Sequence, residues 1–309
     1  MKIAVTHPDE TARRHWVRAL AARLPEARVA DWPAPEAHGA DFAVVWKPPA
    51  GFFAAHPALR AVFSAGAGVD HLLRHGDVPA TLPVVRLEDA GMARQMIDYC
   101  LHAVLRIVLR ADAYEAQQRD ACWRELAPVA RTDLTVGVLG IGALGGQVAR
   151  ALAAAGFRVL GHARSPHRID GVECLHGDAQ LPSFLARTHV LILMAPLTDD
   201  TRHLIDARRL ALLPRPAWLV NVARGALVDA QALLAALDAG ALEGATLDVF
   251  DTEPLPPEHP FWRHPRIRVT PHVAAATLVE PSADQVADKI RRLLRGEPIT
   301  GAVGRDRGY

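Results

Sequence analysis

Three glycines before a predicted helix have the spacing that suits a dinucleotide. In "LTVGVLGIGALGGQ", Gly140, Gly142 and Gly145 fit the pattern G-x-G-x-x-G between a predicted strand and a predicted helix. The first two glycines permit a tight turn and close approach of a pyrophosphate, and the third permits close helix–strand packing. The phosphate would meet the free N–H groups of the helix start, at Ala143 and Leu144. A tight turn without a ligand is the alternative.

A basic stretch further on, "FRVLGHARSPHR", bears on which dinucleotide binds. In such folds a carboxylate about 20 residues beyond the glycines binds the ribose hydroxyls, whereas an arginine accommodates a 2′-phosphate. No acid stands there; Arg164 lies 19 residues after Gly145 and Ser165 follows it. A carboxylate would repel the phosphate, whereas these side chains offer it hydrogen-bond donors. The sequence therefore predicts NADP(H) in preference to NAD(H), and the alternative is a solvated basic turn.

Strand-like apolar runs that could position these residues occur in two series. The first is "KIAVTH", "DFAVVW", "LRAVFSAG" and "LPVVRL"; the second is "TVGVLG", "FRVLGH", "HVLILMAP", "AWLVNVA", "GATLDVF" and "IRVTPH". Short, nearly continuous apolar strands separated by helices indicate parallel sheets covered on both faces. We therefore predict an α/β protein with two doubly wound parallel-sheet domains. One large sheet is the alternative.

Two helical patterns accompany these strands. Apolar residues from Ile97 to Val108 recur with helical spacing and predict a long helix over 90–121 that links the two units. Near the C-terminus, "SADQVADKIRRLLRGE" predicts an amphipathic helix ended by Gly296 and Pro298. No strand series follows this helix, so we expect it to pack on the first unit.

Composition narrows the class of protein. The chain has 309 residues, half of them apolar, and a net charge of +1, so nothing favours a nucleic-acid or anionic-membrane partner. Cys100, Cys122 and Cys174 show no metal or redox spacing and suit free thiols in a reducing cytoplasm. There is no signal-peptide layout and no apolar run of about 20 residues. We expect a cytoplasmic protein without a membrane span or a bound metal.

Further motifs resemble the D-isomer-specific 2-hydroxyacid dehydrogenase family. They are "VNVARGALVD", "LDVFDTEPLP" and "VTPHVAAAT", and the likeness extends over nearly the whole chain, including "PLTDDTRHLI". The variants "SAGAGVDHL", "LEDAGMARQM" and "FWRHPRIRVTPH" are most similar to the glyoxylate/hydroxypyruvate reductase A branch, which prefers NADPH. The resemblance implies reduction of a small 2-keto acid by a homodimer that associates through the 90–121 region.

The resemblance also implies a domain arrangement. A Rossmann-type NADP-binding domain, residues 98–282, is inserted in a flavodoxin-like substrate domain. Residues 1–97 form the first segment of that domain, and residues 283–309 form a C-terminal helix that returns to it. We expect the catalytic site in the cleft between the domains, which should close over NADPH and the keto acid.

The family's catalytic residues correspond to Arg224, Glu253 and His272. Reduction of a keto group needs a proton on its oxygen, which His272 can supply because imidazole titrates near neutrality. Glu253, bonded to the far ring nitrogen, would orient the imidazole and favour its charged form. Arg224 presents a planar fork of donors to the substrate carboxylate and carbonyl. All three follow predicted strands, where open α/β sheets bind ligands. The alternatives are a surface histidine, a solvated acid and an arginine that caps a strand end.

Other residues correspond to the family's binding positions. Backbone N–H groups of Ala67 and Gly68 are implied to hold the substrate carboxylate, and Trp46 to wall the pocket, although it could be a core aromatic. Asp248 corresponds to a residue near the nicotinamide carboxamide. The remaining implied cofactor contacts are Pro196, Val222, Ala223 and His272. Ala275 departs from the glycine that many relatives have, with an expected effect on local packing only.

The functional prediction leaves alternatives open. The pocket shape depends on the loops around Trp46, Met92 and Trp262. If the two tryptophans wall the pocket, glyoxylate and hydroxypyruvate should be better substrates than bulky aryl keto acids such as phenylpyruvate. One alternative is an NAD-linked D-2-hydroxyacid dehydrogenase of another substrate, which Arg164 disfavours. The other is a dinucleotide-sensing binding protein, as in the corepressor relatives of this fold.

Overall fold

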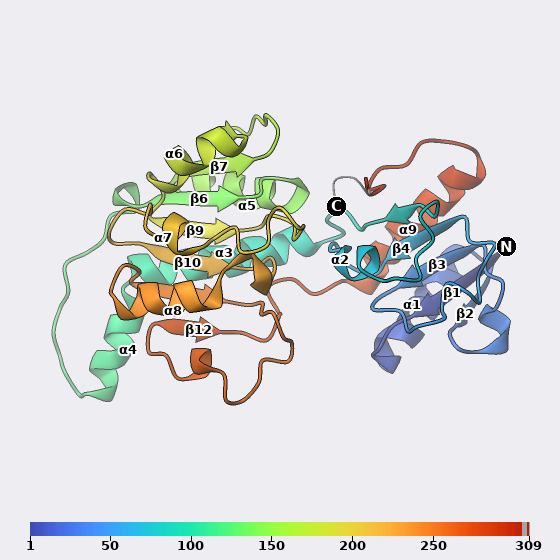
Figure 1. Ribbon diagram of the computed structural model, residues 1–309, viewed down its shortest axis with the longest axis horizontal. Coiled ribbons are helices and arrows are strands. Elements are labelled where there is room, and N and C mark those ends of the chain that lie inside the picture. Colours follow the sequence, from blue (N-terminus) through green and yellow to red (C-terminus); the bar gives the residue numbers. More distant parts are fainter. Residues whose placement is uncertain (305–307, 309) are drawn as a thin grey trace. The chain divides into compact units, whose positions relative to one another are not determined.

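The computed structural model of the protein describes residues 1–304 and 308, and the chain forms two compact units (Figure 1). Unit 1 combines Met1–Met92 with Thr277–Tyr309, and unit 2 is Ala93–Ala276. The chain passes between the units at the first residues of a helix, Met92–Val108, and just before another, Val279–Leu294. The positions expected from the sequence, after 97 and after 282, lie a few residues inside these two helices.

Unit 1 contains a five-stranded parallel sheet in the order β2-β1-β3-β4-β5. Its strands are β1 (Lys2–Thr6), β2 (Arg28–Asp31), β3 (Phe42–Val45), β4 (Ala61–Ser64) and β5 (Val84–Val85). This is the flavodoxin-like order. All residues of β3 and β4 are buried, as expected for central strands covered on both faces.

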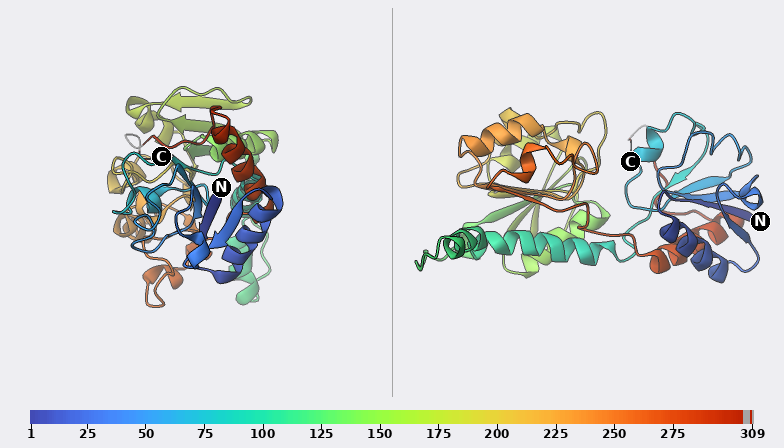
Figure 2. Two further views of the ribbon diagram at one scale, coloured as in Figure 1. Left: turned by 90° about the vertical axis from the view of Figure 1, so that its right-hand side faces the viewer. Right: turned by 90° about the horizontal axis from the view of Figure 1, so that it is seen from below.

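The helices of unit 1 come from both ends of the chain. They are α1 (Glu10–Arg23), η1 (Pro35–Ala37), α2 (Asp70–Leu73) and α9 (Val279–Leu294). α9 buries Ala283, Val286 and Ile290 and packs against α1, and Figure 2 (right) shows these two helices side by side. Arg23 at the end of α1 pairs with Asp284 of α9 at 2.6 Å. The C-terminal helix therefore completes the core of unit 1.

Unit 2 contains a seven-stranded parallel sheet in the order β12-β11-β10-β9-β6-β7-β8. Its strands are β6 (Thr135–Leu139), β7 (Arg158–Ala163), β8 (Val172–His176), β9 (Val190–Leu193), β10 (Trp218–Asn221), β11 (Gly244–Leu247) and β12 (Ile267–Val269). Counted within the unit, this is the Rossmann order 3-2-1-4-5-6 with one added strand. The order reverses between β6 and β9, where such folds bind ligands.

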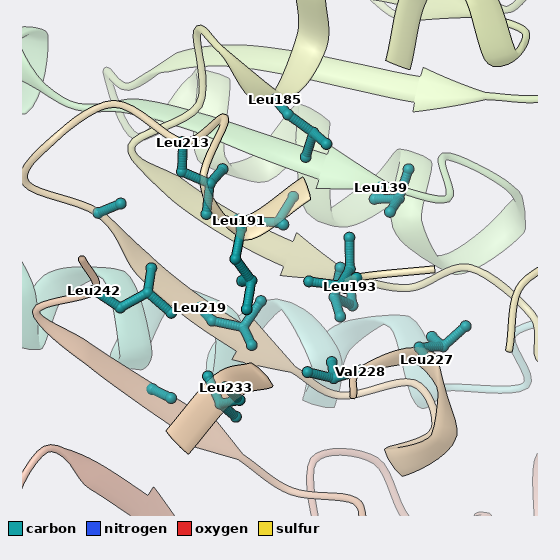
Figure 3. Close-up of a cluster of buried hydrophobic side chains, with 14 of the residues drawn as sticks. Leu139, Leu185, Leu191, Leu193, Leu213, Leu219, Leu227, Val228, Leu233 and Leu242 are labelled. Atoms are coloured by element: carbon teal, nitrogen blue, oxygen red, sulfur yellow. The ribbon is translucent and has the colours of Figure 1, made fainter. Parts of the chain in front are cut away.

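Helices cover both faces of this sheet, as Figure 2 (right) shows. They are α3 (Met92–Val108), α4 (Ala111–Arg119), η2 (Arg131–Asp133), α5 (Ala143–Ala154), η3 (Asp178–Gln180), α6 (Leu181–Leu185), α7 (Ala207–Leu210), η4 (Gly225–Leu227), α8 (Ala230–Asp238) and η5 (Pro260–Trp262). Buried side chains of α3 and α5 share one core cluster with the sheet. α6, α7 and α8 build the other, which is rich in leucine (Figure 3).

These two sheets confirm the predicted fold class, with two differences in detail. The edge strands β2 and β8 were not predicted. The single long helix predicted over 90–121 is wrong: Arg110 takes a left-handed φ of 52° and separates α3 from α4. In the described part of the chain, no helix combines the length and apolar character needed to cross a membrane.

Candidate active site

His272 and Glu253 form a hydrogen-bonded pair in unit 2. The imidazole Nδ1 lies 2.8 Å from Oε2 of Glu253, and because a carboxylate only accepts, Nδ1 carries the hydrogen. The other carboxylate oxygen accepts a 3.0 Å hydrogen bond from the backbone N–H of Phe250, which fixes the carboxyl group to its own loop. The side chains are 39% and 28% exposed, respectively. With Nδ1 engaged, Nε2 is the ring nitrogen that can exchange a proton with a ligand.

Asp248 fixes the backbone that carries His272. It follows β11, is 1% exposed, and its carbonyl oxygen accepts a 2.9 Å bond from the His272 N–H. Its carboxylate accepts 2.8 Å bonds from the N–H groups of Val273 and Ala274. His272 has a φ of 56°, which is uncommon for a residue with a side chain. Such a conformation persists where several contacts enforce it, and here three consecutive N–H groups bond to one residue.

Arg224 lies in the loop after β10, whose shape depends on a buried amide. The Asn221 side chain accepts from the N–H of Ala223 at 3.1 Å and donates to the carbonyl of Arg224 at 2.9 Å. A Cβ on Gly225 would lie 2.1 Å from the carbonyl carbon of Phe250, so only glycine lets this loop meet the loop after β11. The half-buried guanidinium donates to the Ala223 carbonyl at 2.7 Å.

The three residues predicted to be catalytic thus follow three neighbouring strands. β10 pairs with β11 and β11 with β12, all in parallel, so Arg224, Glu253 and His272 belong to loops at one carboxyl edge. The hydrogen bond between Glu253 and His272 joins the second loop to the third. Arg224 can therefore hold an anionic group, and His272 can deliver a proton, at the same edge of the sheet.

The glycines of the β6–α5 turn divide by what surrounds them. A Cβ on Gly140 would lie 2.4 Å from the backbone nitrogen of Ala195, and one on Gly145 would lie 2.0 Å from the carbonyl oxygen of Gly140. These two glycines serve internal packing. A Cβ on Gly142 would meet nothing within 4 Å, and Gly142 is exposed at the N-cap of α5, where no side chain caps the helix. The turn therefore has room for a phosphate at the helix N-terminus.

Arg164 and Ser165 follow β7 and are exposed. The Gly140 N–H donates to the carbonyl of His162 at 2.8 Å, which ties the end of β7 to the glycine turn. His167 Nδ1 lies 2.8 Å from the carbonyl of Ser165, so the basic stretch forms a compact turn. The two residues predicted to bind a 2′-phosphate therefore follow a strand end that is bonded to the glycine turn.

Trp46 and the loop after β4 lie together in unit 1. A Cβ on Gly66 would lie 2.7 Å from the Trp46 ring, so the indole packs directly over this glycine. The ring centroids of Trp46 and His71 are 4.3 Å apart. Ala67 and Gly68 are partly exposed beside them. The two predicted substrate-binding features of unit 1 therefore share one loop region.

The remaining predicted positions differ in burial. Pro196 is exposed, Leu144 is half-buried, and Val222 and Ala223 are 4% and 9% exposed, with side chains in the two core clusters of unit 2. Because the side chains of Val222 and Ala223 are buried in the core, these two residues could contact a ligand only through their backbone atoms. Met92 is buried, whereas Trp262 is half-exposed with its Nε1 donating to the Pro256 carbonyl at 3.0 Å. Among the described residues, no three His, Cys, Asp or Glu side chains gather as a metal site.

Two supporting residues escaped the sequence analysis. Asn221 shapes the Arg224 loop, and Thr270 donates a 2.6 Å hydrogen bond to Oδ1 of Asp248. Each is a polar residue at the end of an apolar strand. A polar residue at a strand end is visible in the sequence, but the sequence does not show which group it bonds.

Comparison with known proteins gives a consistent picture. The family model for D-isomer specific 2-hydroxyacid dehydrogenase, NAD binding domain, matches residues 101–274. The glyoxylate/hydroxypyruvate reductases A of Yersinia enterocolitica and Serratia proteamaculans are 43% and 44% identical over 314 aligned positions. The match covers all of both chains in each case.

Solved structures agree over the same length. A D-isomer specific 2-hydroxyacid dehydrogenase from Xanthobacter autotrophicus Py2, in complex with NADPH and MES, is 41% identical with a TM-score of 0.95. An NADPH-dependent glyoxylate/hydroxypyruvate reductase from Sinorhizobium meliloti, in complex with NADP and sulfate, is 38% identical with a TM-score of 0.94. Each match covers 100% of this chain and 99% of the other.

Proposed function

Because the chain belongs to the D-isomer-specific 2-hydroxyacid dehydrogenase family, we propose that it is an NADPH-dependent reductase of small 2-keto acids. Glyoxylate and hydroxypyruvate are the proposed substrates, with glycolate and D-glycerate as products. The relatives of that name support this choice. The observation that carries the chemistry is the 2.8 Å bond between His272 and Glu253, beside the loop of Arg224.

The residues present fit NADPH. The space at Gly142 and the uncapped N-terminus of α5 suit the pyrophosphate, and Arg164 and Ser165 suit the 2′-phosphate. When bound, NADPH supplies the hydride for the carbonyl carbon. Asp248, close in the chain to the catalytic loops, is the proposed neighbour of the nicotinamide end.

The chain's own residues supply charge and a proton. Arg224 binds the carboxylate and carbonyl of the keto acid through its planar guanidinium. His272 gives a proton from Nε2 to the carbonyl oxygen, while Glu253 on Nδ1 fixes the ring and balances its positive charge. Backbone N–H groups of Ala67 and Gly68 complete the binding of the carboxylate.

We further propose a cytoplasmic homodimer that associates through the 90–121 region. Apolar side chains on and after α3 and α4 support this assignment: Leu109 and Tyr114 are exposed and Trp123 is fully so. α4 buries none of its residues within the described chain. Sedimentation velocity would give the mass in solution.

A steady-state panel tests the proposed reaction. Turnover should be fastest with NADPH and either glyoxylate or hydroxypyruvate, and much slower with phenylpyruvate or with NADH. Tight NADPH binding without turnover of any 2-keto acid would instead identify a dinucleotide-sensing protein. A preference for NADH would contradict the assigned cofactor.

A further inference from the structure

A partly buried chain of hydroxyl groups connects helix α3 to Asp248. The phenol oxygen of Tyr99 lies 2.6 Å from Oγ1 of Thr270, and Oγ1 lies 2.6 Å from Oδ1 of Asp248. Tyr99 belongs to α3, on the sheet face opposite α8, whereas Thr270 directly follows β12. All three residues lie within unit 2.

The direction of hydrogen-bond donation along this chain follows from Asp248. Both of its carboxylate oxygens accept backbone N–H groups, so the carboxylate takes the hydroxyl hydrogen of Thr270 as well. Thr270 has one such hydrogen, and therefore Tyr99 must donate to Thr270. Burial, assisted by the charge of Asp248, raises the pKa of Tyr99 to about 12, so the phenol keeps its hydrogen at any ordinary assay pH.

Asp248 connects these hydroxyl groups to His272, the proposed proton donor. Its carboxylate and carbonyl bind the N–H groups of residues 272–274, and His272 is held with its φ at 56°. The carboxylate is 1% exposed, so water does not replace a missing donor at Oδ1. If Thr270 turned away, the carboxylate would lose one of its three donors and could shift relative to the His272 segment.

We propose that Tyr99 is a positioning residue for catalysis, which acts through Thr270 and Asp248 to hold His272 at the angle that proton transfer requires. The inference rests on the proposed function, because it presupposes that His272 delivers the proton. Tyr99 touches no reacting atom. Its hydroxyl fixes the rotamer of Thr270, which otherwise has other staggered positions to adopt.

Tyr99→Phe tests this role because it removes one partly buried oxygen and leaves the ring. We expect kcat with glyoxylate and NADPH to fall about fivefold, the effect of one neutral hydrogen bond. KM for glyoxylate and the Kd of NADPH should stay within about twofold, since Arg224 and the phosphate contacts are untouched. A merely structural role would lower the unfolding midpoint without separating kcat from KM.

Thr270 provides the paired variants. Thr270→Val breaks both links and should lower kcat about 30-fold, because it removes a bond to a charged group. Thr270→Ser keeps the hydroxyl and should restore most of that loss. Adding Tyr99→Phe to Thr270→Val should cost nothing more, since both changes interrupt one chain. Thr188→Val is the matched control: it deletes a buried hydroxyl that bonds the Phe184 carbonyl at 2.8 Å, and should leave kcat unchanged.

Two control measurements distinguish a failure of this proposal from a failure of the proposed function. Turnover by the unaltered protein and its loss in His272→Asn establish that His272 acts. Once both are seen, the proposal is overturned by a Tyr99→Phe kcat within twofold of normal, by a loss that appears only in KM, or by additive effects in the double variant. If the unaltered protein turns over no keto acid, the proposed function itself is wrong.

Discussion

His272 combines a left-handed backbone with a side chain in contact with Glu253, and a substitution can separate the two. Asparagine tolerates positive φ better than most residues, so His272→Asn should fold normally. We expect kcat to fall by about 10²–10⁴, the usual contribution of general acid–base catalysis. Steady-state kinetics and a thermal melt measure the two effects. Turnover close to that of the unaltered protein would remove His272 from the mechanism.

Arg164 is the residue proposed to select NADPH over NADH. A charge-assisted hydrogen bond contributes about 1.5–3 kcal/mol, so Arg164→Ala should weaken NADPH about 10- to 150-fold and leave NADH nearly unchanged. Fluorescence titration gives both dissociation constants. Arg158→Ala, at the opposite end of β7, removes the same charge and should affect neither cofactor. Equal losses of NADPH and NADH in Arg164→Ala would indicate general electrostatics and contradict a bound 2′-phosphate.

Individual residues were predictable where a motif fixes their type and position. Arg224, Glu253 and His272 were found through their motifs, and the structure places them on neighbouring loops; their catalytic roles stay predictions. Asn221, Thr270 and Tyr99 were not found, because their importance lies in contacts across the fold. A hydroxyl on α3 and another after β12 give no sign in the sequence that they meet.

At the scale of elements, alanine substitutions at two glycines of the β6–α5 turn should have opposite effects: one should weaken NADPH binding and the other should lower stability. Gly142→Ala adds a methyl group to open space at a φ of −74°, so folding should change little. That methyl would occupy the proposed phosphate position and weaken NADPH at least about tenfold. Gly145→Ala puts a methyl 2.0 Å from a carbonyl oxygen and should cost about 1–3 kcal/mol of stability.

Urea unfolding and NADPH titration of both variants measure these responses. Normal NADPH binding by Gly142→Ala would mean that the turn holds no phosphate. Normal stability of Gly145→Ala would show that α5 can move away from β6 at little cost.

Elements with continuous apolar runs were predicted well, and the exceptions have physical reasons. β2 and β8 are edge strands with mostly exposed or half-exposed residues, so "RVAD" and "VECLH" lack the run that marks a central strand. The sequence also gives no signal for the break between α3 and α4. Arg110 takes a left-handed φ there although it is neither glycine nor proline, and the polar residues continue into α4.

For the whole molecule, stability should fall as the pH drops below neutrality. Burial lowers the pKa of His7, His56, His162 and His189 below 6.5 in the folded state. Above the unfolded value both states are neutral and stability is fully present. As the pH falls through 6.5 towards the folded values, the unfolded chain takes up protons first, which costs up to about 1.4 kcal/mol per pH unit for each histidine. Urea midpoints between pH 7.5 and 5 measure the decline.

His56 offers a specific check on that decline. It is 2% exposed, and its Nδ1 accepts the Ala40 N–H at 3.2 Å. His56→Asn keeps an acceptor but cannot titrate, so its stability should vary less steeply with pH even if the absolute stability is lower. An unchanged slope would assign the pH dependence to other groups.

The packing of α9 against α1 has a consequence for synthesis on the ribosome. All of unit 2 is translated after α1 and before α9. While Ala283, Val286 and Ile290 are still inside the exit tunnel, α1 can pack on β1 and β2 but lacks its helical neighbour. The nascent chain can therefore finish the Rossmann unit first, and the unit that begins at the first residue is the last to become complete.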